Sequence, residues 1–304
     1  MTRFGIGLPQ VFAGEAIDPG AIRAIARRAE ALGFADGWVQ ESLLSRSPAL
    51  DGLELLSHVA AVTDRIGLGI SVVVLPQHDP VVLAKRMATV DRLSGGRLIA
   101  GVGVGAPRAS YGPAAGGGTT AERFEEVHGL LEALWRGERV VHRGVRWWAD
   151  GVAVTPVPRQ RPRPPVWFGA RSPAALRRAA RLGDGWMGAG SSTREDFVRQ
   201  RATVLAALEA AGRDPAAFTI SKRVYIRVDD DRRRARQRRD AYLDGLYGPG
   251  WPPREVAVAG PAERCAEALD ELVAAGAQHL ALTPMFDDAE QVEALAALAG
   301  LGAR

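Results

Sequence analysis

The stretch IGLGISVVVLP, residues 66 to 76, decides the fold together with the segments that follow it. Its series of β-branched and aliphatic residues predicts a long buried strand over Ile66–Leu75. A helical pattern follows over Pro80–Leu93, and Leu98–Val104 is predicted to be a further strand. A strand, a helix and another strand in close succession predict parallel strands joined by a helical crossover.

The same alternation extends along the whole chain. Eight strand–helix pairs in 304 residues favour a closed (β/α)8 TIM barrel, an α/β fold, over an open doubly wound sheet. Gly248–Val258 is expected to be irregular. Further strands are predicted at Phe4–Leu8, Gly37–Val39, Val166–Gly169, Gly185–Ala189, Thr219–Val228 and His279–Thr283, and further helices at Asp18–Leu32, Leu53–Thr63, Ala121–Trp135, Ala174–Leu182, Arg194–Ala211, Asp231–Leu246, Ala262–Ala275 and Ala289–Leu298.

One region breaks the alternation. Val140–Thr155 is predicted to form a hairpin that turns at Trp148–Gly151. Five prolines in Pro156–Pro165 exclude a helix there. We therefore expect an insertion over 137–165, made of a hairpin and a Pro-rich loop, within a single domain over 1–304.

Arginine dominates the positive charge. Only Lys85 and Lys222 are lysines among the 39 Lys and Arg residues, the formal net charge is +4 and the sequence pI is about 9.7. Both a nucleic-acid-binding protein and a GC-rich genome give such a composition. The densest cluster, Arg232–Arg239, has no interleaved aromatic residues and no helix-turn-helix pattern, so it is interpreted as a solvated helix face. We expect no nucleic-acid partner, and a contact between this cluster and the acidic tail of a cofactor stays open.

Several chemistries lack the residues that they need. The lone Cys265 excludes an intramolecular disulfide and zinc sites with two thiolates, and the five histidines show no metal-ligand spacing, so no metal is expected. No Gly-x-Ser-x-Gly motif is present. The longest apolar stretch, Ile66–Leu75, is half of a membrane span, and no signal peptide is evident. We expect a soluble, cytoplasmic protein with a small-molecule substrate and no membrane partner.

The candidate site residues follow the predicted strands, because the active site of such a barrel lies at the carboxyl ends of its strands. Glu41 is a candidate for proton transfer or for holding a polar cofactor edge. Ser71, in a strand with two glycines, indicates a bulge or a close approach to a ligand. Gly103 and Gly105 clear space inside the barrel, and Arg108 is a candidate partner for a phosphate or carboxylate.

The segment Gly169-Ala170-Arg171-Ser172 opens a predicted helix. Backbone amides at a helix N-terminus, a hydroxyl and an arginine together form an anion cradle. Each candidate also has a structural alternative. Ser172 can be an ordinary helix N-cap, and loop amides can satisfy the Glu41 carboxylate. The glycines can serve packing in the crowded barrel interior, and Arg108 can be a solvated loop residue.

At this point the chain resembles the bacterial luciferase-like flavin and deazaflavin oxidoreductases over nearly its whole length. The segments Asp64–Lys85 and Asp91–Gly105 are the most specific, and Pro165–Ala170, Asp184–Trp186 and Val258–Pro261 support them. The resemblance implies a (β/α)8 barrel with an insertion, often a homodimer. It also implies reduced FMN or coenzyme F420 at the carboxyl ends of the strands.

The resemblance also assigns parts of the cofactor site. Members commonly have a non-prolyl cis peptide at a bulge in the third strand, behind the isoalloxazine-type ring, and Ser71–Val72 is the matching position. Gly169–Ser172 matches the phosphate-binding loop of the family.

The acid/base residues depart from the family. Where many members have Asp-His after the second strand, this chain has Glu41-Ser42. The histidine, tryptophan and glutamate of the sugar-phosphate dehydrogenases correspond to Ser42, Arg46 and Ala106, which argues against that activity. Glu41 and Tyr111 remain as acid/base candidates.

Three functions follow as hypotheses. The first is an oxidoreductase that uses coenzyme F420 for hydride transfer to or from a small organic substrate. The second is an FMN-dependent monooxygenase. The third is a non-catalytic flavin-binding or deazaflavin-binding protein, which the missing acid/base residues leave open.

Overall fold

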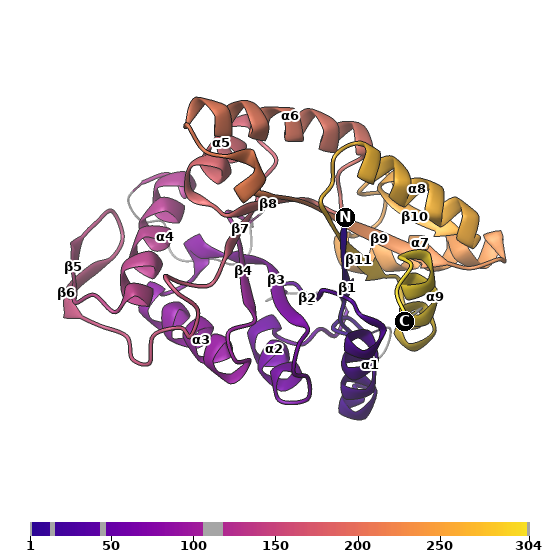
Figure 1. Cartoon of the computed structure of the whole chain (residues 1–304), viewed down its shortest axis with the longest axis horizontal. Coiled ribbons are helices and arrows are strands. Elements are labelled where there is room, and N and C mark those ends of the chain that lie inside the picture. The colour runs from indigo at the N-terminus through magenta and orange to yellow at the C-terminus, as the bar shows by residue number, and fades with distance from the viewer. Residues whose placement is uncertain (1, 13–15, 43–46, 106–117, 303–304) are drawn as a thin grey trace.

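The computed structural model describes residues 2–12, 16–42, 47–105 and 118–302, in which eight parallel strands form a barrel surrounded by helices (Figure 1). The barrel strands are β1 (Arg3–Gly7), β2 (Asp36–Val39), β3 (Gly67–Val74), β4 (Leu98–Gly103), β7 (Val166–Gly169), β8 (Gly185–Gly188), β9 (Thr219–Val228) and β11 (His279–Pro284). Strand β9 pairs with both β8 and β11 and thereby closes the barrel. The predicted (β/α)8 fold is confirmed.

The helices begin and end where local chemistry predicts. The Asp18 carboxylate accepts the Gly20 N–H at 2.7 Å and begins the first helix, and Gly33 ends it with a φ of +94°. No helix in the described ranges is long and apolar enough to cross a membrane. The helices are α1 (Pro19–Leu32), α2 (Gly52–Ala60), α3 (Pro80–Leu93), α4 (Thr120–Arg136), α5 (Pro173–Leu182), α6 (Arg194–Ala210), α7 (Arg232–Tyr247), α8 (Ala262–Ala274) and α9 (Asp288–Leu298).

The insertion contains the predicted hairpin, whose strands β5 (Val140–Arg143) and β6 (Trp148–Val152) project beyond α4 in Figure 1. The predicted turn at Trp148–Gly151 is wrong, because these residues belong to the second strand. The chain turns at residues 144–147 instead. Glu126 of α4 fixes this turn, since its carboxylate accepts the Trp147 N–H at 3.0 Å and lies 2.9 Å from His142 Nε2.

A second difference lies near the C-terminal end of β9. The segment expected to be irregular contains a 3-10 turn, Arg254–Val256, and a short strand β10 (Ala257–Gly260). Strand β9 has ten residues and extends beyond the barrel. Its first residues pair with β8, and the residues from Tyr225 to Val228 pair with β10. The extra strand satisfies backbone groups that β8 is too short to reach.

The lower barrel is closed by packed side chains. Trp38 and Trp167 pack against each other with ring centroids 5.3 Å apart and ring planes tilted by 30°. Beneath them His279 lies 2.7 Å from Ser221 Oγ and 2.9 Å from Asp36 Oδ1. This Ser–His–Asp set is completely buried, so no substrate reaches it, and it serves to satisfy polar groups in the barrel floor. The upper, carboxyl end of the strands is left for the site.

Candidate functional site

A cleft of about 590 Å³ opens at the carboxyl ends of the barrel strands. Its walls come from β2, β3, β7, β8, β9 and the segments after them, and Tyr247 and Trp251 lie at one side. Many of the predicted site residues line this one cleft, although they are far apart in the sequence. They are Glu41, Ser71, Val72, Gly105, Gly169, Ala170, Arg171 and Ser172.

The other predicted residues are placed differently. Gly103 does not line the cleft and lies directly behind Val72. Arg108 and Tyr111, together with Arg46 and Ala106, fall outside the described residues.

The third strand forms one wall of the cleft through a bulge. Its register against β4 shifts between Ile70 and Val73, and the Ser71–Val72 peptide bond is cis, as the resemblance implied. A Cβ atom on Gly103 would lie 2.6 Å from Val72 Cγ2, and one on Gly169 would lie 2.7 Å from Val72 Cγ1. Both distances are too short for a real contact, so glycine at these positions lets Val72 enter the cleft wall.

Glu41 follows β2 at the edge of the cleft, and its side chain is only 4% exposed. Its Oε2 atom accepts the Val74 N–H at 2.9 Å and lies 3.0 Å from His78 Nε2. Its Oε1 atom is buried and has no partner among the described residues. The predicted loop-amide contact is therefore present, and one carboxylate oxygen is still left for a ligand.

The start of α5 lines another part of the cleft. Ser172 Oγ accepts the Ala175 N–H at 3.3 Å, so this residue caps the helix, and Pro173 occupies the first helical position. Arg171 is exposed beside them and lines the cleft. A helix N-terminus beside a guanidinium is the kind of arrangement that can bind a phosphate.

Lys222 of β9 lies behind the loop that follows β8. Its ammonium donates to the Ala189 carbonyl, and to the carbonyl and hydroxyl of Ser192 at 2.8 and 2.9 Å. Burial, opposed by Asp196 and reinforced by nearby Arg171, lowers the pKa of Lys222 to about 7. No pattern in the sequence had pointed to this residue.

Arg223, the next residue, points toward the cleft from the same strand. Its Nη1 atom donates to Gln40 Oε1 at 3.1 Å, and its Nη2 atom donates to the Ser71 carbonyl at 2.9 Å and to the Ser71 hydroxyl. Arg223 was not predicted as a site residue either, because Thr219–Val228 was interpreted only as a strand. Cations within an otherwise apolar strand were the available indication.

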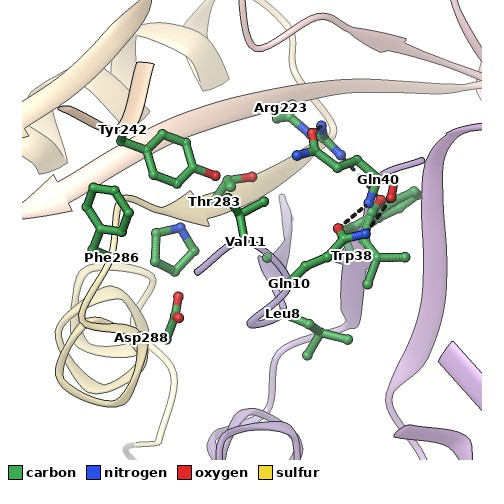
Figure 2. A pocket seen from close by; sticks show the side chains of 13 residues that line it. Leu8, Gln10, Val11, Trp38, Gln40, Arg223, Tyr242, Thr283, Phe286 and Asp288 are labelled. Carbon is green, nitrogen blue, oxygen red and sulfur yellow. Dashed lines mark hydrogen bonds between the residues drawn. The ribbon is translucent and has the colours of Figure 1, made fainter. Parts of the chain in front are cut away.

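A small second pocket adjoins the cleft and shares Gln40 and Arg223 with it (Figure 2). Its volume of about 30 Å³ suits a water molecule. Tyr242 and Asp288 line its other side. Burial, and then the neighbouring Asp287, raise the pKa of Asp288 to about 6.

Comparison with known proteins gives matches along most of the chain. The model of the luciferase-like monooxygenase family matches residues 2–255. An F420-dependent glucose-6-phosphate dehydrogenase of Nakamurella multipartita is 30% identical over 237 residues, which cover 73% of this chain and 68% of the relative. A phthiodiolone/phenolphthiodiolone dimycocerosates ketoreductase of a Mycobacterium species (strain JLS) is 27% identical over 198 residues. That match covers 64% of this chain and 52% of the ketoreductase, so it spans about half of that relative.

Solved structures share the fold. An F420-dependent secondary alcohol dehydrogenase in complex with an F420–acetone adduct superposes with a TM-score of 0.82 at 17% identity, over 98% of both chains. A monooxygenase from Streptomyces bottropensis gives a TM-score of 0.81 at 24% identity, over 96% of both chains. The family model and the relative at 30% identity together show that this chain belongs to the luciferase-like monooxygenase family.

Proposed function

We propose that this protein transfers a hydride between coenzyme F420 and a small organic substrate bound in the 590 Å³ cleft. The observation that carries the proposal is the pairing of two features in that cleft. The Ser71–Val72 bulge forms one wall, and the N-terminus of α5 with Arg171 lines the same cleft. A relative and a solved neighbour whose names include F420 support this choice of cofactor.

The residues of the cleft fit a phosphorylated ring cofactor. The wall near Val72 is made of glycine and small apolar groups, against which a flat ring can pack. The α5 N-terminus and Arg171 suit the phosphate. When bound, the deazaflavin supplies the carbon that accepts or returns the hydride, while the protein orients the reactants and excludes water.

Glu41 is the group placed to handle the proton. An alcohol that is oxidised by hydride loss also loses its hydroxyl proton. Glu41 lines the cleft, and its buried Oε1 atom has no partner among the described residues, so this carboxylate is the candidate proton acceptor. His78 contacts the other carboxylate oxygen at 3.0 Å and holds Glu41 in place.

The substrate we propose is an apolar alcohol or ketone. Tyr225, Tyr247 and Trp251 line the cleft, and the last two rings meet edge to face at 4.8 Å. Aromatic walls favour apolar substrates. Ser42, at the position of the catalytic histidine in the sugar-phosphate dehydrogenases of the family, argues against a sugar phosphate.

The test is a set of anaerobic titrations of the purified protein with oxidised and reduced F420 and FMN, followed by assays with a panel of secondary alcohols and ketones. At least tenfold tighter binding of F420, substrate-dependent change of its absorbance and no oxygen uptake support the proposal. Binding of reduced FMN alone with oxygen uptake would replace it by a monooxygenase. Cofactor binding without turnover across both panels would favour the non-catalytic binding protein.

A further inference from the structure

Arg223 is a buried cation that no carboxylate of the described residues neutralises. It is 9% exposed, and all its hydrogen-bond acceptors belong to neutral groups, on Gln40, Val39 and Ser71. Its Nε atom is also buried and has no partner within the described ranges. An unpaired charge that is removed from water costs several kcal/mol, so a buried arginine with only neutral partners indicates that an anion completes the site.

The position of Arg223 specifies where that anion lies. Its guanidinium donates both to the carbonyl and to the hydroxyl of Ser71, the first residue of the cis peptide in the bulge. Ser71, Val72 and Arg223 all line the same cleft. A ring packed on this wall would therefore lie next to the guanidinium, whereas Arg171 and Ser172 line the cleft from the start of α5.

The charges around the cleft leave a positive balance. Glu41 is the lining carboxylate, and its Oε2 atom is already engaged by Val74 and His78. Arg171 also lines the cleft, and Lys222 lies behind the loop after β8. Tyr225 and Tyr247 face the cleft as phenols whose hydroxyls are 2.7 Å apart, and burial raises the pKa of Tyr247 well above its usual value.

We propose that Arg223 binds the deazaflavin ring in its anionic form and thereby favours oxidised F420 over oxidised FMN. This inference rests on the proposed function. The oxidised deazaflavin ring carries a phenol whose negative charge spreads toward the pyrimidine carbonyl, whereas the oxidised flavin ring is neutral near pH 7. A cation held against the ring stabilises the first and gains nothing comparable from the second.

The experiment is a pH titration of protein-bound F420, followed by the absorbance change of the ring as it ionises. In the wild-type complex we expect the pKa of the ring phenol to lie about one to two units below that of free F420. Arg223→Gln should return it to near the free value. Arg223→Lys keeps a cation at the site and should retain part of the shift.

Arg171→Gln is the matched control, because it removes an equal charge from the proposed phosphate site of the same cleft. It should weaken F420 binding and leave the pKa of the ring nearly unchanged. The ratio of FMN to F420 dissociation constants should fall at least tenfold in Arg223→Gln and stay constant in Arg171→Gln.

The outcomes separate the two proposals. If F420 does not bind the wild-type protein, the proposed function fails. If F420 binds with the ring pKa of the free cofactor, or if Arg223→Gln leaves the wild-type shift in place or Arg223→Lys leaves it undiminished, the role of Arg223 is wrong while the proposed function stands. Circular dichroism shows whether each variant is folded, and the lysine variant decides the question if the glutamine variant is not.

Discussion

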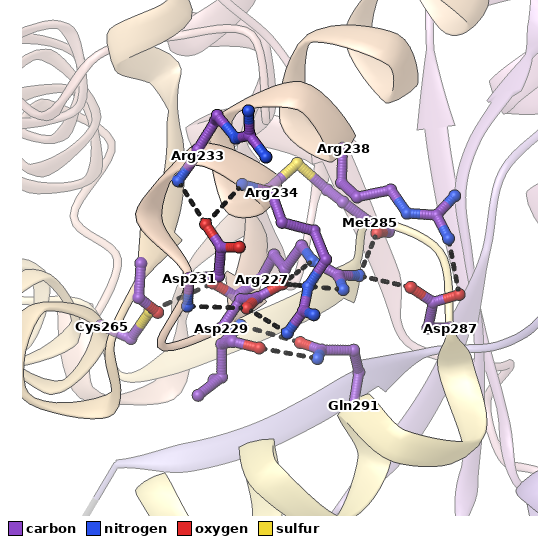
Figure 3. Close-up of polar contacts among 12 residues, drawn as sticks. Arg227, Asp229, Asp231, Arg233, Arg234, Arg238, Cys265, Met285, Asp287 and Gln291 are labelled. Atoms are coloured by element: carbon purple, nitrogen blue, oxygen red, sulfur yellow. Dashed lines mark hydrogen bonds and ion pairs between the residues drawn. The ribbon is translucent and has the colours of Figure 1, made fainter.

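Two arginines of strand β9 are four residues apart, on the same side of the strand, and have opposite surroundings. Arg227 is 2% exposed, donates to Asp229 from Nε at 3.2 Å and Nη2 at 3.0 Å, and donates from Nη1 to Asp287 at 2.8 Å (Figure 3). Arg223 has only neutral partners. Carboxylates of the fold itself neutralise the charge of a buried arginine such as Arg227. Where such carboxylates are lacking, as around Arg223, a ligand is needed to neutralise the charge.

The surroundings of Arg227 hold the C-terminal third of the barrel together. Asp229 also accepts from Arg234 of α7 at 2.7 Å, and Asp287, just before α9, is 3.4 Å from Arg238 (Figure 3). The expectation that Arg232–Arg239 is only a solvated helix face is thus corrected for these two arginines. They are paired because β9 and the start of α9 present carboxylates to one side of α7.

The largest effect is expected for Arg227→Met. It leaves the buried Asp229 carboxylate with fewer cations, and we expect the free energy of unfolding to fall by about 3 kcal/mol, the lower part of the range for breaking a buried ion pair. Urea unfolding measures it. Arg223→Met is the matched control and should change stability by less than about 1 kcal/mol, because it removes an unpaired buried charge. Equal losses of unfolding free energy in both variants would contradict the distinction between a paired and an unpaired buried arginine.

The next largest effect is expected at the proposed phosphate site, where Arg171 and Ser172 line the cleft. Arg171→Ala combined with Ser172→Ala should weaken cofactor binding by ~1–3 kcal/mol, or roughly 5- to 150-fold, if these residues grip the phosphate. Because Ser172 also caps α5, Ser172→Ala alone and Arg171→Ala alone separate the loss of the cap from the loss of the cation. Unchanged affinity of the double variant in a fluorescence titration would refute the phosphate site.

The dependence of stability on acidic pH should distinguish the ion pairs around Arg227 from the residues of the cleft. Hydrogen bonds from Arg234, and further ones from Arg227, lower the pKa of Asp229 to about 2. A carboxylate with a lowered folded pKa contributes stability that is complete above about pH 4 and is lost as the pH falls toward 2. The difference in unfolding free energy between the wild type and Asp229→Asn should therefore be constant above pH 4 and narrow below it. A difference that persists undiminished at pH 2 would contradict this assignment.

The fold and part of the site followed from the sequence because local patterns determine them. The glycines and Ser71 of β3 indicated a bulge or a close approach to a ligand, and the glycines at the end of β4 indicated space inside the barrel. The Gly169–Ser172 segment indicated a helix start facing an anion. The turn of the hairpin was misplaced because Glu126, which fixes it, comes from a different element. Such tertiary contacts are not visible in a local pattern.

Arg223 and Lys222 were missed for a related reason. A strand pattern indicates which residues alternate between the two faces of the strand. The role of a cation in that strand depends instead on the residues that surround it in the folded protein. Arg223 depends on Ser71 and Gln40, which are 152 and 183 residues away in the chain. The charged residues within the β9 pattern were themselves the indication that something polar lies beside that strand.

The smallest effect is expected for Lys222, a third buried cation of β9, whose acceptors are neutral like those of Arg223. Its pKa of about 7 means that it is charged below pH 7 and neutral above. Lys222→Met should weaken binding of an anionic cofactor roughly fivefold at pH 6, or ~1 kcal/mol, and hardly at all at pH 8.5. The ratio of wild-type to variant dissociation constants cancels the cofactor's own titration.

Stability gives an independent check on the same lysine. Because its folded pKa lies below that of an unfolded lysine, the unfolded chain binds the extra proton between about pH 7 and 10.5. Wild-type stability should therefore rise with pH across this interval relative to Lys222→Met. A ratio of dissociation constants that is independent of pH, together with parallel stability curves, would mean that Lys222 stays charged. It would then act as a permanent cation behind the loop, as Arg223 does at the cleft wall.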